Sequence, residues 1–266
     1  MSGATPRHLK RYAYRCLRLA RYFKCPGDGR VKEQIGAESL LWALIVGEIL
    51  RQGAFHAIEA LVGSRARRAL AVAKAFGDDS LAYFTERLDP GPTRRALALA
   101  LHQAKRNKAF ENGRFIGLAL DGTGAARTRN NRCRWCRPIR DSKDQVVGYN
   151  HRFSLITVVG TGLSLPFDVE PYGPGDSEQA ASLRLLKRAV EQLGPRFAGY
   201  VVVDGLYAQA PFLHEAVDLG LHPVVRLKEN LPELLAAAKA RFANRRHSLS
   251  FQAREGPRGD LGRLRF

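Results

Sequence analysis

The chain has 266 residues, enough for one large domain or for a small domain joined to a medium one. Its 43 lysines and arginines exceed its 25 acidic residues, and the formal net charge of +18 favours a polyanionic partner such as nucleic acid. Four cysteines in a chain of this length do not indicate a disulfide framework, and no signal segment or membrane-spanning stretch is evident, so we expect a cytoplasmic protein without a membrane partner.

The first part of the sequence has helical periodicity and no strand pattern. The segment 39–50 is apolar almost all round, which is typical of a buried helix. The residues 89–92, Asp-Pro-Gly-Pro, are a strong loop signal. The sequence predicts helices over 39–50, 55–62, 65–75, 81–88 and 93–107. We therefore expect an all-helical, DNA-binding N-terminal domain over residues 1–110.

The pattern changes to short apolar runs alternating with helices after residue 110. The sequence predicts strands over 115–120, 146–160, 163–169, 199–203 and 222–227, and helices over 176–193, 207–219 and 231–242. A hairpin is predicted to begin near residue 248, with its second arm near 262. This order predicts an α/β domain over 111–266 with a mixed sheet flanked by helices.

Two aspartates are the strongest chemical signal. Asp121 and Asp204 each follow a short apolar run, and a glycine follows each of them. Functional groups gather at strand ends in α/β sheets, and two neighbouring carboxylates repel each other unless a cation lies between them. Carboxylate oxygens suit Mg²⁺ or Mn²⁺, and a metal pair promotes reactions at phosphodiesters. The alternative is that each aspartate only caps the turn after its strand.

Four segments around these aspartates carry a family resemblance. They are LALDGTG around Asp121, YNHRFSLITVV from residue 149, VVVDGLYA around Asp204 and VVRLKEN from residue 224. With the upstream segments GDDSLAYFTERLDP and AKRNKAF, they resemble the DDE transposases of bacterial insertion sequences, most closely the insertion-sequence 4 type. The resemblance covers roughly residues 75–245.

The resemblance implies a ribonuclease H-like catalytic core with catalytic aspartates on the first and fourth strands. The predicted strand order puts Asp121 and Asp204 on those strands. It further implies a DNA transposase that cuts transposon ends and joins them to target DNA, with two Mg²⁺ or Mn²⁺ ions held by the two aspartates. Double-stranded DNA is the implied partner, a homodimer on paired ends the implied assembly, and the bacterial cytoplasm or nucleoid the implied location.

The third carboxylate of such a core is not evident in this sequence. In the insertion-sequence 4 type, a β-rich insertion separates the fifth strand from the helix that carries the catalytic glutamate. Here the apparent insertion begins near Ser248 and the chain stops at Phe266, so we expect a truncated core that is inactive alone. Glu229 and Glu233 are alternative candidates, although both are also explained as acids at a helix N-terminus. Glu170 and Glu178 are weaker candidates for the same role.

Basic residues follow the first and fifth predicted strands. The planar fork of arginine suits phosphate oxygens. His151 lies alone in a predicted strand, where a structural role is favoured over a catalytic or DNA-binding one. The candidates for DNA binding are Arg127, Arg129, Arg132, Arg134, Arg137, Arg226 and Lys228.

Cys133 and Cys136 form a CxxC motif within the basic segment that follows the first predicted strand. A four-thiolate zinc site would need Cys16 and Cys25 as well, but these lie far away in the sequence and are not themselves a CxxC. The sequence therefore favours two turn cysteines beside Trp135 in a DNA-contacting hairpin, with zinc as the alternative.

Two other functions stay open. A non-catalytic DNA-binding remnant or regulator of transposition would use the basic residues and would not need Asp121. Another ribonuclease H-like nuclease would use both aspartates and would hydrolyse DNA without strand transfer.

Overall fold

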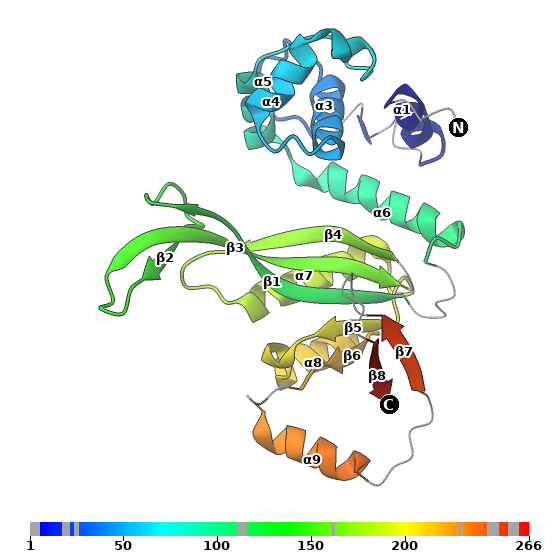
Figure 1. Cartoon of the computed structure of the whole chain (residues 1–266), viewed down its shortest axis with the longest axis vertical. Coiled ribbons are helices and arrows are strands. Elements are labelled where there is room, and N and C mark those ends of the chain that lie inside the picture. Colours follow the sequence, from blue (N-terminus) through cyan, green and yellow to red (C-terminus); the bar gives the residue numbers. More distant parts are fainter. Residues whose placement is uncertain are drawn as a thin grey trace.

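The computed structural model describes residues 6–17, 22–23, 27–110, 116–160, 163–227, 229, 231–243, 250–254 and 261–265. Its first part is helical, and its only β pairing among these residues is one bridge between Asp28 and Leu88. The helices lie above the sheet in Figure 1. They are α1 (Pro6–Arg15), α3 (Ala37–Ile49), α4 (Phe55–Gly63), the 3-10 helix η1 (Arg65–Arg68), α5 (Asp78–Arg87) and α6 (Pro90–Arg106).

The helices α3, α4 and α5 share a hydrophobic core of their own. Trp42 of α3 packs in one cluster with Leu81 and Phe84 of α5, and all three are buried. The Nε1–H of Trp42 donates to the carbonyl of Leu70 at 2.9 Å, so its polar atom is satisfied inside the core. The prediction of a buried helix over 39–50 is confirmed by α3.

Two helix boundaries in this part were predicted wrongly, each for a local reason. The helix predicted over 65–75 is limited to η1, because the chain turns at Ala71, whose φ is +59°. The segment 89–92, predicted as a loop, contains the start of α6. Asp89 caps α6 by accepting the N–H of Gly91 at 2.9 Å, and proline is tolerated in the first turn of a helix.

The second part is built on a six-stranded mixed sheet. β3 is antiparallel to β1 and β4 to β3, whereas β5 is parallel to β1 and β6 to β5. The short strand β2, which the sequence did not predict, pairs with the beginning of β3. The strands are β1 (Gly117–Thr128), β2 (Arg137–Arg140), β3 (Val146–Gly160), β4 (Leu163–Tyr172), β5 (Tyr200–Val203) and β6 (His222–Val225).

The order across the sheet, β2 apart, is β4-β3-β1-β5-β6. Three antiparallel strands followed by two parallel ones form the ribonuclease H-like arrangement, so the predicted fold class is confirmed. Asp121 lies on the first core strand, and Asp204 directly follows the fourth.

Helices cover one face of this sheet. α7 (Glu178–Leu193) and α8 (Ala210–Asp218) pack on it, and α6 packs against α7 and β4. Leu118 and Leu120 of β1 lie in the core cluster with Leu185 of α7 and Val201 of β5. Alternate residues of a strand face opposite sides of the sheet. On the face opposite to α7 and α8, Val224 of β6 is 50% exposed. The described helices that pack on the sheet therefore leave the second face partly open.

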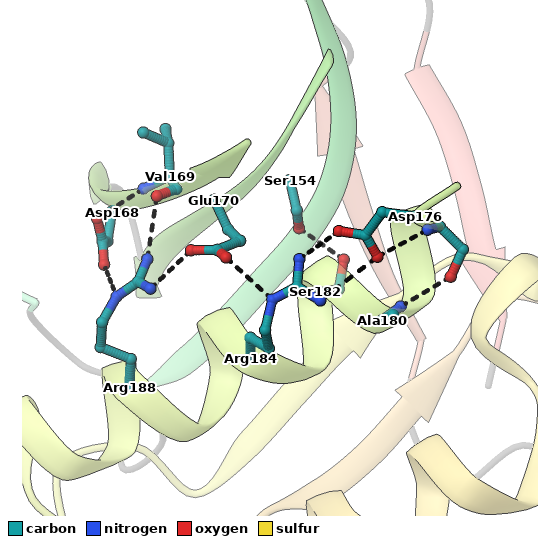
Figure 2. Close-up of polar contacts among 10 residues, drawn as sticks. Ser154, Asp168, Val169, Glu170, Asp176, Ala180, Ser182, Arg184 and Arg188 are labelled. Carbon is teal, nitrogen blue, oxygen red and sulfur yellow. Dashed lines mark hydrogen bonds and ion pairs between the residues drawn. The ribbon is translucent and has the colours of Figure 1, made fainter. Parts of the chain in front are cut away.

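An ion-pair network fixes α7 to β4 (Figure 2). Arg188 reaches Asp168 through Nε and Glu170 through a terminal nitrogen, both at 2.7 Å. Arg184 also pairs with Glu170, at 3.0 Å, and Arg94 of α6 reaches the second oxygen of Asp168 at 2.7 Å. Asp168 thus joins two helices to one strand.

The last described segments are α9 (Pro232–Phe242) and an antiparallel hairpin of β7 (Ser250–Arg254) and β8 (Leu261–Arg265). The hairpin confirms the prediction of arms near residues 248 and 262. None of the residues of α9 is buried. Among the described helices, none is both long and apolar enough to cross a membrane.

Candidate active site

Asp121 does not end its strand, contrary to the prediction of a strand over 115–120. β1 continues to Thr128, because its second part pairs with β3 as a long antiparallel ribbon. Only the parallel pairing with β5 stops early, at Ala119 opposite Val202. Asp121 therefore lies where β1 leaves its parallel neighbour.

The register between β1 and β5 brings the two aspartates to the same level. Ala119 and Val202 are the last pair between these strands, which lie about 4.8 Å apart where they pair, and Asp121 and Asp204 each come two residues after this pair. Because side chains alternate, Asp121 faces away from the buried Leu118 and Leu120. The same alternation from β5 gives Asp204 the partly open face of the sheet.

The two carboxylates differ in their local contacts. Asp121 is exposed and accepts the N–H of Gly122 at 2.9 Å. Asp204 is half-buried and accepts the N–H of Leu206 at 2.8 Å, which caps the 3-10 helix η2 (Gly205–Tyr207). The turn-capping role considered from the sequence is therefore present at Asp204.

No third carboxylate completes a compact cluster in the part of the chain that the structure describes. Glu229 and Glu233 are exposed, and Glu233 lies in the first turn of α9. Neither forms, with Asp121 and Asp204, a set of ligand atoms within 4.8 Å of one another among the described residues.

The structure brings a different glutamate, Glu178, beside the first aspartate. Glu178 opens α7, and its carboxylate lies against the backbone of Gly122, where a Cβ atom would overlap it. Gly122 faces the helix-covered side of the sheet, so Glu178 and Asp121 approach β1 from opposite faces. The glycine after Asp121 is thus required by a close contact. The sequence ranked Glu178 below Glu229 and Glu233, because an acid in the first turn of a helix is a common feature.

Glu178 belongs to a buried hydrogen-bond network. It accepts the hydroxyls of Tyr172 at 2.9 Å and Tyr207 at 3.0 Å. The hydroxyl of Tyr207 also bonds Ser182 at 2.9 Å, and Ser182 bonds Ser154 at 2.6 Å. Burial, with the nearby charge of Glu178, raises the pKa of Tyr207 far above its ordinary value, so this tyrosine stays protonated. The network fixes the start of α7 beneath β1 and β3.

A second cluster of side chains lies further along the β1–β3 ribbon. The Nε2 atom of His151 lies 3.2 Å from both Sγ of Cys133 and Sγ of Cys136, and the two sulfurs are 3.7 Å apart. Hydrogen bonding at the backbone of Arg132 lowers the pKa of the Cys136 thiol to about 7, despite its burial. His151, which the sequence favoured as merely structural, is thus part of a cluster of ligand atoms.

Among the described residues, Cys16 is not part of this cluster. Cys16 is exposed just after α1, and Cys25 lies outside the described residues. The four-thiolate arrangement considered from the sequence is therefore not seen in the described part of the chain. Trp135, which lies between Cys133 and Cys136 in the sequence, is half-buried.

The arginines predicted to bind DNA after β1 differ in their contacts within the protein. Arg137 of β2 donates to the carbonyls of Gly173 and Asp176, at 3.1 and 2.9 Å, and is therefore engaged within the protein. Arg134 stacks on the ring of Trp135 with 4.7 Å between the guanidinium carbon and the ring centroid. The exposed arginines of this segment are Arg127, Arg129, Arg132 and Arg134.

One exposed arginine lies beside the aspartates. The N–H of Arg226 donates to the carbonyl of Val203 at 3.0 Å, which continues the pairing of β5 with β6 by one residue. Since Val203 pairs with Val225, Arg226 is at the level of Asp204 on the neighbouring strand. Lys228 lies outside the described residues.

No family model and no curated protein matches this sequence. Among solved structures, the piggyBac transposase synaptic complex with hairpin DNA is similar at a TM-score of 0.38 and 12% identity, over 96% of this chain and 57% of that chain. A simian T-cell lymphotropic virus intasome in complex with the PP2A regulatory subunit B56 gamma is similar at a TM-score of 0.28 and 14% identity, over 55% of this chain and 51% of that chain. The chain thus spans just over half the length of these two, and the fold assignment rests on its strand order.

Proposed function

We propose that this chain carries the core of a DNA transposase of the DDE class, of the insertion-sequence 4 type, which cuts at transposon ends and transfers the strand to target DNA. The observation that carries the proposal is the position of Asp121 and Asp204, each two residues after the last pair between two adjacent parallel strands of a ribonuclease H-like sheet. Both aspartates face the side of the sheet that the packed helices leave partly open, where a DNA backbone has access.

The donor set fits a hard divalent cation. Two acceptor-only carboxylates from adjacent strands suit Mg²⁺ or Mn²⁺, and their mutual repulsion is relieved when a cation binds. Asp121 and Asp204 would hold the metal, which when bound supplies electrostatic stabilisation of the oxygens at the reacting phosphodiester. Arg226 would bind a neighbouring phosphate oxygen, and the exposed arginines after β1 would hold the duplex through its backbone.

The alternative of a non-catalytic DNA-binding remnant or regulator has an observation in its favour. Among the described residues, no carboxylate forms with Asp121 and Asp204 a group of three ligand atoms that all lie within 4.8 Å of one another. In a complete transposase, the third ligand, a second copy of the chain and the paired DNA ends would all belong to the working assembly. A nuclease of another kind would share the two aspartates and would differ in product.

Mn²⁺ binding measured by calorimetry tests the proposal directly. We expect the chain to bind Mn²⁺ and the double variant Asp121→Ala/Asp204→Ala to lose that binding. Asp144→Asn is the matched control, because Asp144 is an exposed acid outside the candidate site and should leave Mn²⁺ binding unchanged.

Equal Mn²⁺ binding by the chain and the double variant would contradict a metal site at the two aspartates and would favour the DNA-binding remnant. If Mn²⁺ binding is lost as expected, incubation with labelled transposon-end DNA and a target plasmid separates the remaining functions. Strand-transfer products support a transposase, whereas cleavage without joining supports a hydrolytic nuclease.

A further inference from the structure

A cysteine–histidine cluster at the far end of the β1–β3 ribbon lies outside the candidate active site. From the geometry of Cys133, Cys136 and His151 we propose a zinc site that fixes the loop between β1 and β2. The three ligand atoms lie within 4.8 Å of one another, and they are the only such group of three among the described residues.

The distances between the ligand atoms match tetrahedral zinc. Bonds of about 2.3 Å to sulfur and about 2.0–2.1 Å to nitrogen require roughly 3.8 Å between two sulfurs and roughly 3.6 Å between sulfur and nitrogen. The observed separations are 3.7 Å between the sulfurs and 3.2 Å from each sulfur to Nε2 of His151. One ion between the three atoms would therefore need shifts of only a few tenths of an ångström.

Two independent elements bring these ligands together. Cys133 and Cys136 are joined by a tight turn in which the N–H of Cys136 donates to the carbonyl of Cys133 at 3.1 Å. His151 comes from β3, and its neighbour Asn150 pairs with Arg137, directly after the second cysteine. The pairing of β2 with β3, which begins directly after the CxxC turn, therefore places His151 next to the two cysteines.

The chemistry of the ligands selects the metal. Thiolates and imidazole prefer zinc over Mg²⁺ or Ca²⁺, which take oxygen ligands. Three protein ligands leave one position of a tetrahedron for water. Zinc binding would displace the protons of the two thiols and hold the loop 129–136, with its exposed Arg132 and Arg134, in one orientation on the ribbon.

Metal analysis and cobalt substitution test this site separately from the active site. We expect the purified chain to hold about one Zn²⁺, and Co²⁺ to give thiolate-to-metal absorption that zinc then abolishes. Cys133→Ser/Cys136→Ser and His151→Gln should lose zinc, whereas Cys16→Ser, a change at an exposed cysteine outside the cluster, should keep it. Asp121→Ala/Asp204→Ala should also keep it.

Alkylation of the unaltered chain gives a readout that does not depend on folding of the variants. Cys16 and Cys133 are both exposed, so both react in the absence of zinc. With zinc we expect Cys16 to react and Cys133 to be protected until a chelator is added. A folded chain without stoichiometric zinc or thiolate–cobalt absorption, a Cys133–Cys136 disulfide in its place, or metal retained by the double cysteine variant would each overturn the proposal.

Discussion

At the scale of single residues, Gly122 shows how a short motif can mislead. The glycine after Asp121 looks like a turn residue, yet β1 continues through it to Thr128. Its small size is needed because the Glu178 carboxylate occupies the place of a side chain. The carboxylate is in turn held by the hydroxyls of Tyr172 and Tyr207 and cannot easily move away.

Gly122→Ala should therefore destabilise the protein by about 1–3 kcal/mol, as overpacking does in a rigid site. Urea unfolding monitored by circular dichroism measures the free energy of unfolding. Gly124→Ala is the matched control. Gly124 lies in the same strand as Gly122, and a Cβ atom added there would have no neighbouring atom within 4 Å. An equal change in the free energy of unfolding for the two substitutions would show that the Glu178 side chain can move away from residue 122 without destabilising the protein.

At the scale of secondary-structure elements, α7 is positioned by charge as well as by its apolar face. Its apolar positions pack on the sheet, while Arg184 and Arg188 reach the acids of β4 (Figure 2). The Asp168 side chain is 4% exposed and binds both Arg188 and Arg94. Removing its charge would weaken its pairs with Arg94 and Arg188, although Arg188 would keep Glu170 as a partner.

Asp168→Asn should lower the free energy of unfolding by about 2–4 kcal/mol, somewhat below the cost of breaking a fully buried ion pair. Asp144→Asn, which breaks an exposed pair with Arg140, should cost less than about 1 kcal/mol. Urea midpoints of the two variants give the comparison. A loss at Asp168 as small as that at Asp144 would mean that apolar packing alone fixes α7.

The secondary structure was predicted best where local sequence decides it. The strand over 146–160 and the end of α7 at Gly194 are as predicted, because apolar residues at both ends of the strand and a helix-ending glycine act through neighbouring residues. The extension of β1 to Thr128 and the existence of β2 were not predicted. Both depend on pairing with β3, and the polar residues of this ribbon carry no strand signal of their own.

At the scale of the whole molecule, the net charge is +18, and several of the exposed arginines that contribute to it lie in the loop after β1. The loop after β1 presents Arg129, Arg132 and Arg134 to solvent, whereas Arg137 is engaged by backbone carbonyls. Phosphate contacts made by such arginines release counterions, so DNA affinity should depend steeply on salt.

Arg132→Ala/Arg134→Ala should reduce the slope of log affinity against log salt by up to about 2, since each lost phosphate contact removes about 0.9. Fluorescence anisotropy with labelled duplex DNA at several salt concentrations measures this slope. Lys239→Ala/Arg241→Ala on α9 removes the same charge elsewhere and serves as the control. An equal change in both variants would indicate a general charge effect instead of a DNA-contacting loop.

The sequence by itself determined the fold class and the two aspartates proposed as catalytic. Apolar runs and helical periodicity are local properties, so they revealed strands, helices and the acids that interrupt them. Only the tertiary structure decided which distant residues meet. Strand register brings Asp121 level with Asp204, a helix start brings Glu178 against Gly122, and β3 brings His151 to Cys133 and Cys136. Periodicity tells which face a residue takes, but the partner on that face depends on how the strands and helices pair in space.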